Sequence, residues 1–137
     1  MTANRRLFTA PDDGHTVNLH TSACGKCILA FLPPKEQKHA IAQLKFQAYT
    51  PHSIMTEEAL REELELVRQR RYATEREEGD LGVFCIAAPI FGGHGTCVAA
   101  TSLSMPVFRV PESLEAMRTD VMEAARKISG ELGCFDN

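Results

Sequence analysis

The stretch at residues 20–34, HTSACGKCILAFLPP, decides what kind of core the chain can build. Thr21 or Ser22 can cap a helix, because a hydroxyl oxygen accepts a hydrogen bond from an amide of the first turn. Behind the cap, apolar residues recur at helical spacing: Cys24, Cys27, Ile28 and Phe31. Two prolines at positions 33 and 34 then end the helix. The stretch therefore predicts a short helix that is buried in the core.

The composition is typical of one globular domain. A chain of 137 residues, 44% hydrophobic and 24% charged, predicts a single domain over residues 1–137. A net charge of −3 offers nothing that attracts nucleic acid. The apolar runs are far shorter than the roughly 20 residues of a membrane helix, and the opening MTANRRLF has no apolar stretch behind its arginines. Five cysteines, an odd number, indicate reduced thiols, so we expect a cytoplasmic protein that does not bind membranes.

The first half of the chain predicts a strand pair and two further helices. Short strands at residues 6–9 and 16–19 flank the turn signal PDDGH and suggest a hairpin. Pro34 suits the first turn of a second helix, whose inward residues are Ala40, Ile41 and Leu44. Thr56 caps a third, amphipathic helix, whose inward residues are Leu60, Leu64 and Val67.

The second half predicts a hairpin and a last helix. Strands at residues 83–91 and 97–105 are joined by GGHGT, and Pro89 indicates an edge or a bulge in the first of them. A helix starts at Pro111 and stops at Gly133. Its predicted inward residues are Leu114, Met117, Val121, Ala125, Ile128 and Leu132.

This order of elements predicts an α+β fold, an antiparallel sheet covered by helices. The apolar hairpin strands do not alternate cleanly between polar and apolar residues, which implies that both faces of the sheet are covered. We expect helices on one face, and a ligand or another subunit on the other.

Cys24 and Cys27 leave three interpretations open. A Cys-x-x-Cys pair at a helix start is a candidate redox site, because the helix dipole lowers a thiol pKa there. With His20 the pair is also a candidate zinc site, although no second pair of metal-ligand spacing follows. The third interpretation is two small residues that face the core.

Gly25 and Lys26 are both unfavourable in the first turn of a helix, since glycine lacks helix propensity and a cation opposes the dipole. One explanation is functional: the amides of Ala23, Cys24 and Gly25 bind a carboxylate, which the glycine lets approach closely. The other is structural, with Gly25 admitting a neighbouring strand and Lys26 reaching solvent along its aliphatic stem.

The hairpin predicts a second group of polar side chains. A loop of two or four residues centred between Gly93 and His94 would place Cys85 opposite Ser102, with Ser104 on the same face. Two hydroxyls and a thiol among apolar residues are typical of a pocket for a small ligand. Alternatively, the serines bond to neighbouring backbone. The acidic run Glu75, Glu77, Glu78 and Asp80 reads mainly as a solvated loop.

Several of these segments together resemble one family. HTSACGKCILAFLPP, YTPHSI, RRYATEREEGDLGVFCIAAPIF and VAATSLSMP follow one another as in the effector-binding domain of the isocitrate-lyase-regulator (IclR) family of bacterial transcription regulators. The resemblance covers residues 18–132. It implies a GAF-like fold, a small carboxylic or aromatic acid as effector, assembly as a homodimer or tetramer, and no cofactor.

The resemblance also implies which residues bind the effector. By position in its motifs they are Ala23, Cys24, Gly25, Glu75, Cys85, Ser102 and Ser104. Departures from the pattern include the two cysteines of the Cys-x-x-Cys pair, Phe84 where arginine is usual, and Arg76 inside an acidic pair.

The family carries a winged helix-turn-helix and further opening elements before this domain. The chain begins after the counterparts of those elements, so we expect a sheet shortened at its N-terminal edge, and DNA contact only through a domain that this sequence lacks. Two rival hypotheses stay open: a cysteine-dependent, GAF-like enzyme that reduces a small sulfoxide, and a pure dimerisation module.

Overall fold

The computed structural model describes residues 4–9 and 19–134, the first of these ranges as backbone only. The elements in chain order are β1 (Asn4–Thr9), α1 (Ala23–Ala30), α2 (Pro34–Ala42), α3 (Glu57–Arg70), β2 (Ala73–Arg76), β3 (Val83–Phe91), β4 (Cys97–Pro106) and α4 (Glu115–Glu131), with a short 3-10 turn at Val107–Arg109. Within these ranges, no helix is both long and apolar enough to cross a bilayer.

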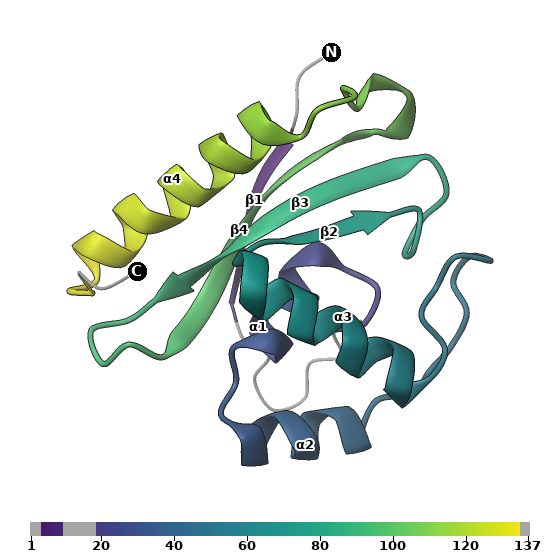
Figure 1. The fold of residues 1–137 in the computed structure, drawn as a ribbon, viewed down its shortest axis with the longest axis horizontal. Helices are drawn as coiled ribbons and strands as arrows, with labels where there is room; N and C mark the ends of the chain where they lie inside the picture. Colours follow the sequence, from purple (N-terminus) through teal and green to yellow (C-terminus); the bar gives the residue numbers. More distant parts are fainter. Residues whose placement is uncertain (1–3, 10–18, 135–137) are drawn as a thin grey trace.

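The strands form one antiparallel sheet in the order β1-β4-β3-β2, with helices on both sides (Figure 1). One face packs against α1, with α3 beside it and α2 farther out, and the other packs against α4. The predicted α+β fold is therefore confirmed. The expected cover of the second face was wrong, because α4 lies where a ligand or another subunit was predicted.

Each face of the sheet carries its own apolar core. On the α1 face, Ala87 and Ala100 are small, which lets α1 lie close to the strands. On the α4 face the strands present larger side chains, and Phe84, Ile86 and Ile90 pack against α4. Small residues on one face and large ones on the other explain why the hairpin strands showed no simple alternation.

Helix α1 begins as predicted, and its first turn is unusually tight. Ser22 is its cap, and the Ser22 Oγ accepts a hydrogen bond of 3.0 Å from the Gly25 amide. A Cβ placed on Gly25 would lie 2.6 Å from both the Cα and the carbonyl oxygen of Leu19. The glycine is therefore required by the chain that enters the helix, because any side chain would meet backbone there.

Most predicted helix faces are confirmed. Thr56 caps α3 through a 3.2 Å bond from the Ala59 amide, and the three predicted inward residues of that helix are buried. In α4 the inward side is Met117, Val121 and Ala125, but Leu132 is 49% exposed, contrary to prediction. Ser129 takes the last inward position instead, where its Oγ accepts from the Phe91 amide and donates to the Ala125 carbonyl, both at 2.9 Å.

Two strand predictions need correction. Residues 73–76, read as part of a solvated acidic loop, form strand β2, which pairs with β3. The predicted strand at 6–9 exists within β1, which pairs with β4. Its expected hairpin partner at 16–19 lies almost entirely outside the described residues.

The register of the β3–β4 hairpin also differs from the prediction. Cys85 lies opposite Ser104, and Ser102 lies opposite Ala87. The bond from the Gly92 amide to the Thr96 carbonyl encloses a three-residue loop, and Val98 is bulged out between Cys97 and Ala99. Each irregularity shifts the pairing by one residue. Since the total shift is two, every side chain keeps its predicted face.

The tight turn at α1 makes Gly25→Ala a costly substitution. We expect a loss of about 2–3 kcal/mol in the free energy of unfolding, because the new methyl group must displace backbone. Gly130→Ala in α4 is the matched control: a Cβ there meets nothing within 4 Å, so stability should hold or rise by up to about 1 kcal/mol. Urea denaturation of both variants measures the difference, and equal stabilities would contradict the packing described.

Candidate functional site

The candidate site starts from a row of polar side chains across the sheet. Pairing places Glu75 of β2 opposite Cys85 of β3, and Cys85 opposite Ser104 of β4. The Cys85 Sγ and the Ser104 Oγ lie 3.1 Å apart. Ser102 is two residues along β4, so it points to the same face. Four of the seven predicted site residues, separated by up to 29 positions in sequence, thus share one surface.

Helix α1 lies over this surface. The Cys27 thiol reaches the carbonyl oxygen of Ala87, which pairs with Ser102, at 3.4 Å. One turn earlier, Ala23, Cys24 and Gly25 form the buried start of the helix. The Gly25 amide donates to Ser22, so a carboxylate bound at this end would meet the amides of Ala23 and Cys24.

Directly after the glycine, Lys26 is buried in the domain. Its side chain is 0% exposed, and its Nζ lies 3.0 Å from a carboxylate oxygen of Glu63 in α3. The same Nζ lies 3.0 and 3.1 Å from the two carboxylate oxygens of Glu78. The structural alternative, in which Lys26 reaches solvent, was therefore wrong: the lysine joins α1, α3 and the loop after β2 through two carboxylates.

The loop at residues 77–79 is held from several sides. The Glu78 amide donates to the Glu75 Oε2 at 2.9 Å, and the Ser53 hydroxyl donates to the Glu78 carbonyl at 2.6 Å. The Thr50 hydroxyl donates to the Glu77 carbonyl, and Glu77 has a positive φ of 56°. These bonds fix the loop, and with it one carboxylate oxygen of Glu75.

Glu75 is only 5% exposed, although charged residues follow it in sequence. Burial raises the pKa of the Glu75 carboxyl. The backbone amides of Glu78 and Gly79 lower this pKa, but by less than burial raises it. A carboxyl of raised pKa takes up a proton more readily, so Glu75 could donate a hydrogen bond as well as accept one.

His20 lies just before α1 with its ring 2% exposed, 5.3 Å from the ring of Phe46. Within the described residues, neither ring nitrogen has a partner with full hydrogen-bond geometry, although the Gln47 backbone lies near the ring. Burial lowers the pKa of His20, more strongly than the Gln47 backbone and the Glu78 carboxylate raise it. The interior therefore favours the neutral imidazole.

Two of the thiols, those of Cys27 and Cys97, do not have the environment of a redox site. Burial raises the pKa of Cys27 well above its ordinary value, and it also raises the pKa of Cys97. A reactive cysteine needs the opposite shift, because the thiolate is the nucleophile. Among the described residues, none of the cysteines forms a disulfide. In the same part of the chain, no group of three metal-ligating side chains comes together, either around His20 or elsewhere.

The residues that sequence reasoning missed are the partners of Lys26. Neither Glu63 nor Glu78 stood out, because helix α3 and the run after β2 are both rich in acidic residues. The available signal was Lys26 itself. A cation in the first turn of a helix, within an otherwise apolar stretch, implies carboxylates nearby.

The chain is similar to known proteins of one family. The model of the family "Bacterial transcriptional regulator IclR C-terminal" matches residues 2–130. The HTH-type transcriptional regulator KdgR of Dickeya chrysanthemi is 37% identical over 119 residues, which are 86% of this chain and 39% of that protein. The chain thus spans about two fifths of the length of this curated relative.

Solved structures share the fold. The C-terminal domain of Escherichia coli KdgR matches with a TM-score of 0.87 and 30% identity, covering 96% of this chain and 88% of that one. The inducer-binding domain of a PobR double mutant from Acinetobacter, solved with 3-hydroxybenzoic acid, matches with a TM-score of 0.77 and 21% identity over 98% and 89% of the two chains. At 21% identity the second match supports the fold alone.

The buried ion cluster makes Lys26→Met a strong test of the site's framework. We expect a loss of about 3 kcal/mol in the free energy of unfolding, because Glu78 would lose its cation and Glu63 would keep only its longer contact with Arg70, at 3.8 Å. Lys127→Met is the matched control, since Lys127 is 74% exposed and its pair with Glu123 is long, at 3.8 Å. That control should change stability by under about 0.5 kcal/mol. Thermal and urea unfolding measure both, and a small effect at Lys26 would contradict the assigned network.

The environment of His20 predicts a pH dependence. Because its pKa is lowered in the folded state, stability is complete above the ordinary histidine pKa of about 6.5 and is lost as the pH falls toward the lowered value. The raised pKa of Glu75 has the opposite effect and adds stability as the pH falls, but this contribution is the same in the parent and in the variants. Between about pH 7 and 5, His20→Phe should therefore lose less stability than the parent protein.

Urea denaturation at several pH values measures this difference. His94→Gln, in the exposed hairpin loop, is the control and should follow the parent. Parallel pH profiles for the parent and His20→Phe would argue against a buried neutral histidine.

Proposed function

We propose that this chain, which belongs to the bacterial IclR C-terminal family, is an effector-binding domain that senses a small carboxylic or aromatic acid. The observation that carries the proposal is the row of Glu75, Cys85 and Ser104 across the sheet, with Ser102 beside it and the start of α1 above. These are the residues through which the family resemblance assigns effector binding. The acid would lie between α1 and the sheet.

The donors available there suit a carboxylate. The hydroxyls of Ser102 and Ser104 can each donate a hydrogen bond, and the amides of Ala23 and Cys24 lie at the positive end of α1. Cys85 and the small residues around it would form the wall. Glu75, whose pKa burial raises, would oppose an anion less than an ordinary carboxylate does, and when protonated could donate to it.

The lysine network would keep these groups in place. Lys26 binds the Glu78 carboxylate, and the Glu78 amide binds the Glu75 carboxylate, so the helix start and the edge of the sheet are joined by two interactions. A site positioned in this way binds with less loss of conformational freedom. We assign Lys26 a positioning role and no contact with the effector.

The rest of the proposal concerns the longer proteins of the family. Regulators such as KdgR are more than twice as long as the matched region, and we propose that DNA contact belongs to a segment outside this domain. An effector would act there by preferring one arrangement of a homodimer or tetramer over another. Since bacterial DNA lies in the cytoplasm, we place the domain there too.

A redox enzyme is the weaker hypothesis. The relatives carry the names of transcriptional regulators, and the raised pKa values of Cys27 and Cys97 oppose thiolate chemistry. The Cys-x-x-Cys pair fits the interpretation of two small residues facing the core, since both cysteines are buried.

Calorimetry with a panel of small organic acids tests the proposal. An acid that binds the parent should bind the Ser102→Ala, Ser104→Ala double variant about 10–100-fold more weakly, because each lost hydrogen bond to a charged group is worth about 1 kcal/mol or more. Thr101→Val is the control, since Thr101 is also buried but points to the opposite face of the sheet. Unchanged affinity in the double variant would refute the site, and binding of no acid at all would refute the function.

A further inference from the structure

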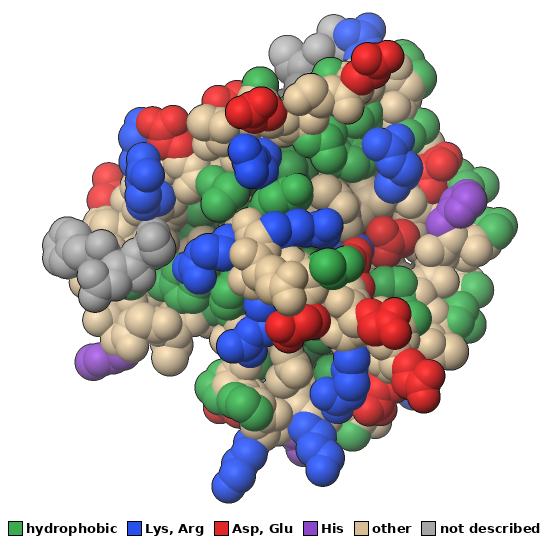
Figure 2. Space-filling model, viewed as in Figure 1, with side chains coloured by type: hydrophobic (Ala, Val, Ile, Leu, Met, Phe, Trp, Pro, Cys, Tyr) green, Lys and Arg blue, Asp and Glu red, His purple; other side chains and the backbone are tan. Residues whose placement is uncertain are grey.

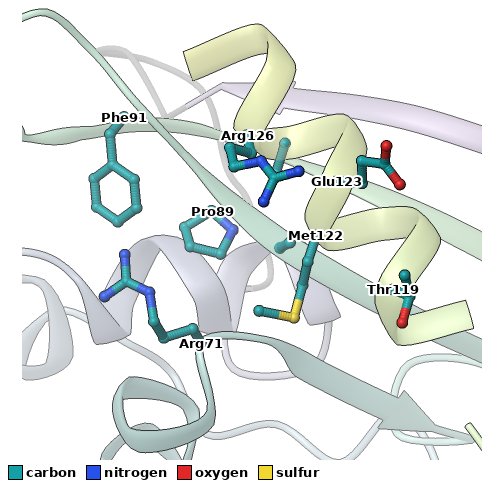
Figure 3. Close-up of a pocket in the computed structure, with 9 residues that line it drawn as sticks. Arg71, Pro89, Phe91, Thr119, Met122, Glu123 and Arg126 are labelled. Atoms are coloured by element: carbon teal, nitrogen blue, oxygen red, sulfur yellow. The ribbon is translucent and has the colours of Figure 1, made fainter. Parts of the chain in front are cut away.

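A groove of about 280 Å³ lies at the edge of the sheet, beside α4 and the end of α3, and includes none of the predicted effector residues. Strand β2 pairs with β3 only as far as Ala73, which lies opposite Ala87. Beyond this pair β3 continues with an uncovered edge, and the groove lies along that edge. Ala88, Pro89 and Ala125 are buried at the bottom, and Met122 and Phe91 form walls (Figure 3). Pro89 suits this edge, because proline has no amide to leave unpaired.

Two arginines enter the groove from opposite sides. Arg71 comes from the end of α3 and Arg126 from α4, and their guanidinium groups lie on either side of Pro89 (Figure 3). Basic side chains border apolar ones on this face of the molecule (Figure 2). The groove thus combines an apolar bottom with two cations at its rim.

Arg71 is held in place. Its backbone has a φ of 67°, which turns the chain out of α3, and its guanidinium carbon lies 5.4 Å from the ring centre of Phe31 and 5.2 Å from that of Phe91. A guanidinium fixed against two rings loses little freedom on binding a ligand.

Neither arginine is neutralised by the protein. Within the described residues, no carboxylate lies within 4.0 Å of Arg71 or Arg126, whereas Arg61, Arg70 and Lys127 each have such a partner. The lining does include Glu123, but its carboxylate points away from Pro89 (Figure 3) and lies 3.8 Å from Lys127. Two arginines without a carboxylate partner among the described residues therefore face a hollow with an apolar bottom.

We propose that this groove is a second anion site, which binds a small carboxylate carried on a flat apolar body. The arginines would bind the carboxylate, since a guanidinium matches its two oxygens, and Pro89, Met122 and Phe91 would cover the apolar part. An inorganic anion would gain nothing from those apolar walls. The groove shares no residue with the proposed effector site, so the two proposals stand or fall separately.

Benzoate is a suitable probe, with benzyl alcohol as its neutral counterpart. In protein labelled with ¹³C at the methionine methyls, benzoate should shift the Met122 resonance along a saturating curve, and benzyl alcohol should bind at least about tenfold more weakly. Arg71→Gln and Arg126→Gln should each raise the midpoint about tenfold. Arg118→Gln, an exposed arginine of α4 outside the groove, should leave it unchanged, and so should the Ser102→Ala, Ser104→Ala double variant.

Four outcomes would overturn the proposal. The first is a Met122 resonance that benzoate does not move, and the second is an equal response to benzyl alcohol. The third is a Met122 resonance that depends on protein concentration without ligand, which would indicate a second copy of the chain in the groove. Loss of the response in the double serine variant would show that the resonance reports the other face, which also overturns it.

Discussion

The ammonium group of Lys26 is a full charge placed in the interior of the domain, and the arrangement around it depends on its two carboxylate partners. Burying a charge is costly unless it is paired, so α1 can pack against the sheet only where Glu63 and Glu78 come with it. One buried lysine therefore fixes three segments at once: α1, α3 and the loop after β2. The loop that carries Glu78 also carries the amide that orients Glu75, which extends the constraint to the edge of the sheet.

The same sheet serves two different surfaces because its faces are packed differently. Small side chains on one face bring α1 close and gather polar groups beneath it, whereas large side chains on the other support α4. Beyond the end of β2, the uncovered edge of β3 borders a groove that also touches α4 and the end of α3. A small domain can in this way offer two chemically distinct sites without extra elements.

Helix faces and the fold class were predictable from sequence, because helical spacing and capping are local: Ser22 and Thr56 cap as expected. The family motifs predicted a set of site residues, and pairing brings three of them, Glu75, Cys85 and Ser104, into one row. The exact register was not predictable, since the bulge at Val98 depends on tertiary packing. Nor was the burial of Lys26, because its partners are 37 and 52 residues away.

The central claim is that a small acid lies between the start of α1 and the serines of β4. A crystal structure of the chain grown with an acid that calorimetry has identified tests it most directly. The account predicts density for the acid within hydrogen-bond distance of Ser102 or Ser104, with its carboxylate toward the amides of Ala23 and Cys24. Side chains filling that space, or the acid bound only elsewhere on the domain, would contradict it.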